Sequence, residues 1–279
     1  MARYGMIIDL DHCIGCYCCQ IACKDEHVGN EFPPYMKPQP AFGQFWIGIK
    51  EVEQVLSPDH VKVTYIPTLS QSKAILKAAK DGAVYQRPDH IVIIDPAKSR
   101  GQQQLVAACP TGAVFWNQEE GIPQKCTFCA HLLDDGWKTT RCSQACPTDC
   151  IMFGDLDNPE STISKFLAAH RDEVEVLHPD EEGPNVLYVG LPKPFVTGTL
   201  ISKETDDCLG GVKVTLTGPG GGAQEGLTDC FGFFRFKTKA KGKHTIAIEA
   251  PGYPRQIHEV EVLDTTVWLG ELGLSPSRT

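Results

Sequence analysis

The chain has 279 residues, of which 42% are hydrophobic and 22% charged, and its formal net charge is −9. This length accommodates roughly two domains of about 150 residues each, and the composition is that of an ordinary globular protein. The acidic balance and the lack of a block rich in Lys and Arg exclude a nucleic-acid binder and a membrane-surface binder, since both concentrate positive charge.

The chain begins with a short strand-like run over residues 1–9, without the apolar stretch of a secretory signal. No run of about 18 apolar residues occurs in the sequence, so we expect no transmembrane helix. These features predict a cytoplasmic protein with no membrane partner. A partner that bears an export signal would still carry it elsewhere.

Thirteen cysteines are many for such a protein, and most of them crowd into two groups. A disulfide framework needs an oxidising compartment, which the sequence does not indicate, and the cysteine number is odd. Metal or iron–sulfur ligation is therefore the leading interpretation.

The first cysteine group is Cys13-x2-Cys16-x2-Cys19-x3-Cys23, the spacing of bacterial ferredoxins. In this arrangement short loops wrap three thiolates around one iron–sulfur cube, and the chain carries the fourth to a second cube. Gly15 permits a tight turn between ligands, where backbone N–H groups face the cluster sulfurs.

A cysteine-free insertion follows over residues 31–104. Residues 45–49 and 61–66 are strand-like, residues 71–80 indicate a helix, and residues 91–94 form a buried-strand pattern closed by Asp95–Pro96.

The motif at Cys109–Pro110 resembles the end of another ferredoxin group. Counting back by the same spacing, the ligand positions hold Leu105, Gln102 and Ser99, and no cysteine lies between residues 24 and 108. We expect this degenerate site to bind no cluster.

The second group is Cys126-x2-Cys129-x12-Cys142-x3-Cys146, followed by Pro147. It repeats the first group with residues 130–141 inserted as a loop. Crossed ligation then predicts two [4Fe–4S] clusters, one held by Cys13, Cys16, Cys19 and Cys146 and the other by Cys126, Cys129, Cys142 and Cys23.

Structural zinc is the alternative, because it also uses paired C-x2-C motifs, but zinc ribbons lack the compressed run of the first group. Cys18 is an alternative to Cys19, although the spacing to Cys23 favours Cys19. Cys150 is interpreted as a packed or spare thiol.

Three cations adjoin ligand positions: Lys24, Lys125 and Arg141. As a hypothesis, they raise the reduction potentials of the clusters by offsetting the negative charge of the thiolates. The alternative is that they are solvated surface residues.

Beyond the second group, Asn158–Pro159 predicts a helix start, and the helix should end near His170. Strands are expected over residues 174–177 and 186–189, and Pro192 and Pro194 mark a linker. The predicted first domain is thus an α+β ferredoxin-like 4Fe-4S domain with insertions, covering residues 1–192.

Residues 195–279 show period-2 alternation in four runs separated by Gly-, Pro- and Asp-rich turns. This pattern predicts a small all-β sandwich or barrel. Cys208 and Cys230 are interpreted as ordinary cysteines of this domain, and we expect it to serve docking or stability.

Nearly the whole chain resembles the small iron–sulfur subunits of the dimethyl-sulfoxide-reductase superfamily, and within it the pyrogallol–phloroglucinol transhydroxylase branch. The matching segments are the first cysteine group, residues 82–86, 91–95, 109–110 and 125–135, and the C-terminal domain, which resembles the transthyretin-like or carboxypeptidase-regulatory-like type.

This resemblance implies a heterodimer, in which a large catalytic subunit holds a molybdenum (or tungsten) bis-pterin guanine dinucleotide and acts on hydroxylated aromatics. The present chain would transfer electrons and carry no catalytic residue. One departure is that the branch implies a third cysteine group before Gly82, where this chain has Thr68, Leu69, Ser70, Gln71, Ser72 and Lys73.

Three alternatives remain open: a resorcinol-hydroxylase-like or other molybdopterin enzyme with an external electron acceptor, a structural subunit whose clusters do not cycle, and a free-standing ferredoxin. Without ligand-spaced partners, His12, His27 and His131 are interpreted as surface or packed residues.

Overall fold

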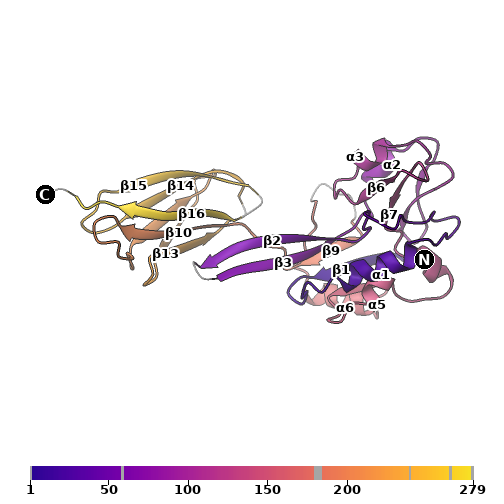
Figure 1. Ribbon diagram of the computed structural model, residues 1–279. Helices are drawn as coiled ribbons and strands as arrows, with labels where there is room; N and C mark the ends of the chain where they lie inside the picture. Colours follow the sequence, from indigo (N-terminus) through magenta and orange to yellow (C-terminus); the bar gives the residue numbers. More distant parts are fainter. Residues whose placement is uncertain (1, 58–59, 179–183, 239, 264–265, 278–279) are drawn as a thin grey trace. The chain divides into compact units, whose positions relative to one another are not determined.

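The computed structural model describes residues 2–57, 60–178, 184–238, 240–263 and 266–277 (Figure 1). The chain divides into two compact units. The first comprises Met1–Lys50 and Tyr65–Leu191, and the second comprises Glu51–Thr64 and Pro192–Thr279. Among the described residues, no helix has the length and apolar character needed to span a bilayer.

The central sheet of the first unit has the strand order β8-β1-β9. Strand β1 (Tyr4–Asp9) pairs antiparallel with β8 (Ile151–Asp155) and parallel with β9 (Val186–Val189). Helix α6 (Thr162–Ala169) packs on this sheet through Ile163, which lies in one apolar cluster with Ile7. The first cysteine group therefore begins a few residues after the C-terminal end of the buried strand β1.

Two elements around this sheet differ from the sequence prediction. Helix α6 is capped by Ser161, whose hydroxyl accepts a hydrogen bond from the Ser164 N–H at 3.2 Å, so Asn158 is not the cap. Instead, Asn158 Oδ1 accepts from the Glu160 N–H in a turn. The predicted strand over residues 174–177 is wrong, since only Glu175 forms an isolated bridge there.

Short paired elements fill the middle of the first unit. They are α2 (Ala74–Ala78), β4 (Val84–Gln86) with β5 (Val92–Ile94), α3 (Gln104–Ala107), and β6 (Val114–Asn117) with β7 (Ile122–Lys125). Helix α2 is shorter than predicted because Gln71 is held outside it. The Gln71 side chain donates to the Cys126 carbonyl and accepts from the Val92 N–H.

Three further helices carry or adjoin the cysteine groups: α1 (Cys18–His27), α4 (Ala130–Asp134) and α5 (Arg141–Gln144). Strands β2 (Gly48–Ser57) and β3 (His60–Thr68) form a two-stranded sheet. The sequence predicted a strand over residues 45–49, whereas β2 begins only at Gly48. Residues 51–64 belong to the second unit, where the Gln54 side chain donates to the Lys193 carbonyl at 2.6 Å.

The second unit is built from two sheets. One has the order β13-β10-β16 and the other β12-β11-β14-β15. Their bounds are β10 Phe195–Ser202, β11 Lys213–Thr217, β12 Ala223–Leu227, β13 Phe233–Lys237, β14 Gly242–Glu249, β15 Gln256–Val262 and β16 Val267–Leu274.

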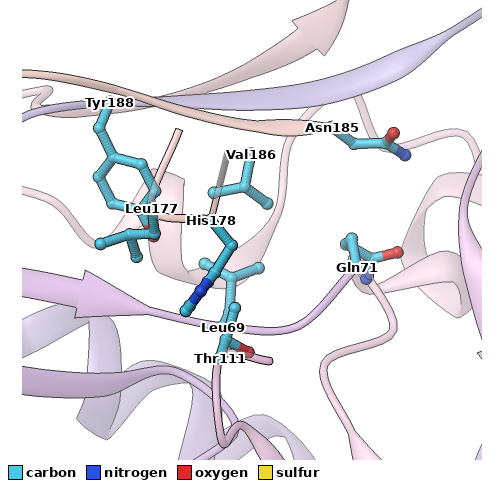
Figure 2. Close-up of a pocket in the computed structure, with 8 residues that line it drawn as sticks. All are labelled: Leu69, Gln71, Thr111, Leu177, His178, Asn185, Val186 and Tyr188. Carbon is cyan, nitrogen blue, oxygen red and sulfur yellow. The ribbon is translucent and has the colours of Figure 1, made fainter. Parts of the chain in front are cut away.

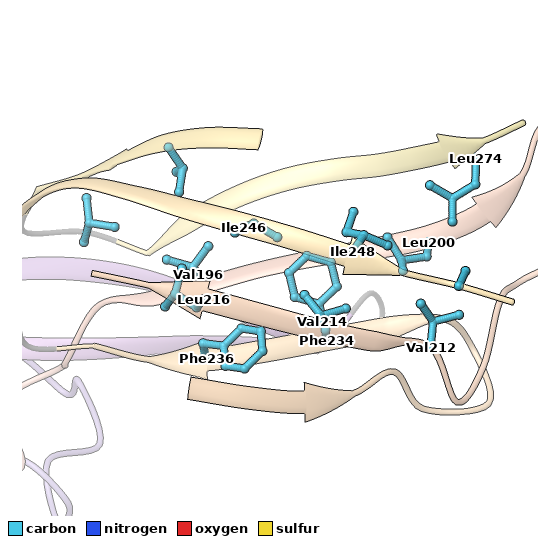
Figure 3. Packing of buried hydrophobic residues seen from close by; sticks show 13 residues of the cluster. Val196, Leu200, Val212, Val214, Leu216, Phe234, Phe236, Ile246, Ile248 and Leu274 are labelled. Carbon is cyan, nitrogen blue, oxygen red and sulfur yellow. The ribbon is translucent and has the colours of Figure 1, made fainter. Parts of the chain in front are cut away.

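One hydrophobic core lies between these sheets (Figure 3). Val196 and Phe236 from the first sheet belong to the same buried cluster as Val214 and Ile246 from the second. The alternating runs are confirmed as strands, because every second side chain of a pleated strand points to the same face. The C-terminal region is therefore largely β, as predicted.

Candidate iron–sulfur centre

The first cysteine group lies on a loop and the helix that follows it. Cys13 and Cys16 lie on the loop after β1, and Cys19 and Cys23 lie one turn apart on α1. Gly15 has φ +65°, and a Cβ there would lie 2.5 Å from the Tyr65 ring, so the predicted tight turn requires glycine. The loop and the buried helix face are thus held by local backbone geometry.

The second group follows β7. Cys126 comes directly after this strand, and Cys129 has φ 50° at the start of α4. Cys142 lies on α5, which Thr140 caps by accepting a hydrogen bond from the Ser143 N–H. Cys146 follows α5, and all four cysteines of the group are buried.

Four predicted ligands share one pocket. Its lining includes Cys13, Cys16 and Cys19 of the first group together with Cys146 of the second, and also the thiol of Cys150. We call Cys13, Cys16, Cys19 and Cys146 the outer quartet, because Cys16 is exposed and Cys13 half-buried. Cys18 is exposed and does not line the pocket.

The other four predicted ligands form the inner quartet, Cys23, Cys126, Cys129 and Cys142, and every one of them is buried. Burial raises the pKa of each thiol, in the case of Cys142 to about 12. The charges of Cys126, Cys129 and Cys142 also act on Cys23 and raise its pKa further. Such thiols ionise only when a cation is bound among them, as metal ligands do.

Hydrogen-bond donors surround the sulfurs in both quartets. In the inner quartet the Phe128 N–H donates to Cys126 Sγ at 3.4 Å, and Thr140 Oγ1 lies 3.2 Å from Cys142 Sγ. In the outer quartet a hydrogen bond with Cys150 is the main cause that lowers the pKa of Cys13 to about 6. Buried thiolates with backbone and side-chain donors are the setting that iron–sulfur clusters require.

The described residues contain no group of three or more His, Cys, Asp or Glu side chains placed to hold a single metal ion. The donor set fits the predicted clusters in its chemistry: two sets of four thiols, each set drawn from both cysteine groups.

The three cations beside ligand positions have different surroundings. Lys125 is only 2% exposed, and its ammonium group donates to the backbone carbonyls of Ser70, Val92 and Cys126. Burial lowers the pKa of Lys125 to about 8. Lys24 donates to carbonyls of a surface loop, and Arg141 forms an ion pair with Glu26. Lys125 is therefore the cation buried beside the inner quartet.

The three histidines singled out in the sequence, His12, His27 and His131, are surface or packed residues, as predicted. His12 is exposed and pairs with Asp9, while His131 pairs with Glu26. His27 is buried, and its Nδ1 lies 2.6 Å from the Cys23 carbonyl oxygen. Burial lowers the pKa of His27 to about 4, so this ring is neutral near pH 7.

The degenerate site is filled by side chains. Cys109 Sγ lies 3.2 Å from both Ser70 Oγ and Thr111 Oγ1, and Cys109 packs in an apolar cluster with Leu105 and Ile75. Ser99 is buried, and the Gln102 amide is bonded to the backbone of Lys80. Packing and polar contacts thus replace thiolate ligands at this position.

A second pocket lies beside the degenerate site (Figure 2). Its polar lining includes Gln71, Asn185 and Tyr188, and each of these side chains is hydrogen-bonded to a backbone carbonyl: those of Cys126, His90 and Pro67, respectively. These side chains thus hold the backbone segments at Cys126, His90 and Pro67 in place. No cysteine lines this pocket, so it supplies no thiol ligand.

Sequence reasoning missed two features. It interpreted Cys150 as a packed or spare thiol, and this thiol is indeed packed, but its contact with the Cys146 sulfur at 3.4 Å was not predicted. It also missed the contacts of Ser70 and Gln71, for which no local pattern exists.

Known proteins resemble this chain over most of its length. A 4Fe-4S dicluster domain family matches residues 68–156. The chain is 36% identical over 261 residues to the pyrogallol hydroxytransferase small subunit of Pelobacter acidigallici, covering 90% of this chain and 92% of that protein.

Two further relatives extend this similarity. The iron-sulfur subunit of a putative dimethyl sulfoxide reductase from Halobacterium salinarum is 33% identical over 251 residues, covering 74% of this chain and 88% of that protein. A subunit of the tetrathionate reductase of Salmonella typhimurium is 34% identical over 203 residues, covering 70% of this chain and 75% of that protein. The chain therefore belongs to the family of iron–sulfur subunits of the dimethyl-sulfoxide-reductase superfamily.

Proposed function

We propose that this chain is the electron-transfer subunit of a molybdopterin-dependent enzyme and that each quartet holds one [4Fe–4S] cluster. The outer quartet would ligate the first cluster through Cys13, Cys16, Cys19 and Cys146. The inner quartet would ligate the second through Cys23, Cys126, Cys129 and Cys142. Such clusters supply one-electron transfer, and the protein sets their potential and accessibility.

The observation that carries this proposal is the exchange of one cysteine between the two groups. Cys146 lines the pocket of the first group, and Cys23 interacts with the thiols of the second. Each quartet thus combines three cysteines of one group with one of the other, as crossed ligation requires. The exposed Cys16 thiol supports a route for electrons between the outer cluster and a partner.

The filled degenerate site supports two clusters rather than three. Cys109 is 7% exposed and is surrounded by Leu105, Ile75 and hydroxyl groups rather than thiols. Hydroxyl and aliphatic side chains do not replace thiolates as iron–sulfur ligands.

We expect a large catalytic partner in a heterodimer, with the molybdenum bis-pterin guanine dinucleotide in that partner alone. The name of the Pelobacter acidigallici relative, a hydroxytransferase small subunit acting on pyrogallol, supports a hydroxylated aromatic as the substrate class. The second unit would be a transthyretin-like or carboxypeptidase-regulatory-like domain, a proposal supported by its two sheets around one core.

Anaerobic purification through a tag on this chain tests the proposal. We expect co-purification of a large molybdopterin subunit and, per copy of this chain, about eight iron atoms and eight inorganic sulfides. Freeze-quenched EPR during turnover with pyrogallol should show reduced-cluster signals that rise and decay. Clusters that stay silent throughout turnover would contradict electron transfer and favour a structural subunit.

A further inference from the structure

A fifth buried thiol lies against the outer quartet. Cys150 is 4% exposed, and its Sγ is 3.4 Å from Cys146 Sγ. Cys13, which comes from the other cysteine group, lines the same pocket as Cys146 and Cys150. Cys150 therefore lies within the outer quartet's pocket, in direct contact with the ligand sulfur of Cys146.

The backbone holds Cys150 in this position. Its carbonyl accepts a hydrogen bond from the Asp9 N–H at 2.8 Å, and the next residue, Ile151, pairs with Ile8 in the central sheet. The Ile151 carbonyl also accepts from the Ser143 hydroxyl at 2.6 Å, which ties this segment to helix α5. Cys150 thus lies on a fixed strand end between the two ligand-bearing segments.

The protonation of the three sulfurs follows from ligation. Cysteines that bind iron do so as thiolates and have no proton to donate. The outer quartet already supplies four ligands for the four iron atoms of one cube. Cys150 is then the sulfur that keeps its proton, and the Cys146 sulfur, 3.4 Å away, is the acceptor.

Resting on the proposed function, we propose that Cys150 is a positioning residue whose S–H donates a hydrogen bond to the ligand sulfur of Cys146. Reduction adds negative charge to the cluster and its thiolates, and a donor near those sulfurs stabilises the added charge. Cys150 therefore raises the potential of the outer cluster and leaves the inner cluster unchanged.

The test compares Cys150→Ala with Cys150→Ser in the anaerobically purified complex. Cys109→Ala is the matched control, since Cys109 is a similarly buried thiol in the degenerate site. EPR-monitored redox titration should show one midpoint potential moved to more negative values in Cys150→Ala. Cys150→Ser, which keeps a donor, should restore most of the shift, and Cys109→Ala should move neither potential.

A second readout is the exchangeable proton near the reduced outer cluster. Electron–nuclear double resonance after exchange into D₂O should detect it in the unmodified complex and in Cys150→Ser, and its signal should be lost in Cys150→Ala.

Iron content separates the possible failures. If Cys150→Ala loses about half of the iron, Cys150 is a ligand and the inference is wrong. If the iron is retained and both potentials stay in place, or if Ser behaves as Ala does, the hydrogen bond has no role. Lack of iron in the unmodified complex would instead refute the proposed function.

Discussion

The two quartets differ in their access to solvent and in the polar groups that lie beside their sulfurs. The outer quartet includes the exposed Cys16 and the half-buried Cys13, whereas all four thiols of the inner quartet are buried. The outer quartet has the thiol of Cys150 beside it, and the inner quartet has the ammonium group of Lys125. One spacing motif, used twice, thus produces two sites with different electrostatic surroundings.

This difference suggests a division of roles. A cluster near the surface can exchange electrons with another protein, while a buried cluster is shielded from water and depends more on nearby protein charges. The buried cluster should also contribute more to folding, because its ligands come from elements that pack around it. Substitutions at the two quartets should therefore have unequal consequences for folding and for potential.

Loss of an inner ligand should be the most damaging change. We expect Cys142→Ser to lose about half of the iron and to prevent stable folding of the first unit, because metal binding there is coupled to burial. Cys16→Ser should lose a similar amount of iron from the outer site but leave a folded chain. Iron analysis measures the loss of metal, and circular dichroism on heating measures the loss of folded structure. Equal loss of structure in the two variants would contradict the expected difference between the quartets.

Acid should destabilise the region around the inner quartet through His27. Burial lowers the pKa of His27 to about 4, so as the pH falls below about 6.5 the unfolded chain binds a proton that the folded chain excludes. Folding stability is therefore lost between about pH 6.5 and pH 4, by about 3 kcal/mol in total.

Urea unfolding of the anaerobic holoprotein at pH 7 and pH 5 measures this loss. His27→Gln should flatten the pH dependence, and His12→Gln, at the exposed surface, should preserve it. Identical pH dependence in His27→Gln and the unmodified protein would exclude His27 as the cause.

Removal of the buried cation should affect the inner cluster alone. Lys125→Met leaves three backbone carbonyls without their donor, and we expect stability to fall by about 2–3 kcal/mol. The potential of the inner cluster should become more negative, because a positive charge beside it is lost.

The matched control for this change is Lys24→Met, since the Lys24 ammonium group donates to surface-loop carbonyls. It should alter the potential of either cluster much less than Lys125→Met does. Redox titration of both variants measures these shifts. If the midpoint potential of the inner cluster is unchanged in Lys125→Met, Lys125 does not raise that potential.

The mildest change is expected at the degenerate site. Cys109→Ser should keep the full iron content and both potentials, because the site is packed with Leu105 and Ile75 rather than with thiols. A cost of about 1 kcal/mol in stability is expected, because a hydroxyl is less apolar than a thiol beside Leu105 and Ile75, although the Ser70 and Thr111 hydroxyls remain as hydrogen-bond partners. Loss of iron in this variant would indicate a third cluster.

The sequence predicted those features that depend on local spacing. The strand alternation of the second unit, the turn at Gly15 and the buried strand over residues 92–94 follow from side-chain periodicity and backbone sterics. The cysteine spacings predict crossed ligation, which stays a prediction until the metal content is measured.

Features that depend on distant parts of the chain were not predictable. Helix α2 is shortened because Gln71 bonds to Cys126 and Val92, residues far from it in sequence. The burial of Lys125 depends on carbonyls from two other segments, at Ser70 and Val92. The grouping of residues 51–64 with the second unit likewise depends on tertiary contacts, which composition does not encode.

Quantitative metal and sulfide analysis of the anaerobic complex, combined with EPR of its reduced form, decides whether the two quartets hold clusters. We expect about eight iron atoms and eight inorganic sulfides per chain, with the signals of two [4Fe–4S] clusters. Zinc without inorganic sulfide would show that the quartets do not hold iron–sulfur clusters, and about twelve iron atoms per chain would instead indicate a third cluster.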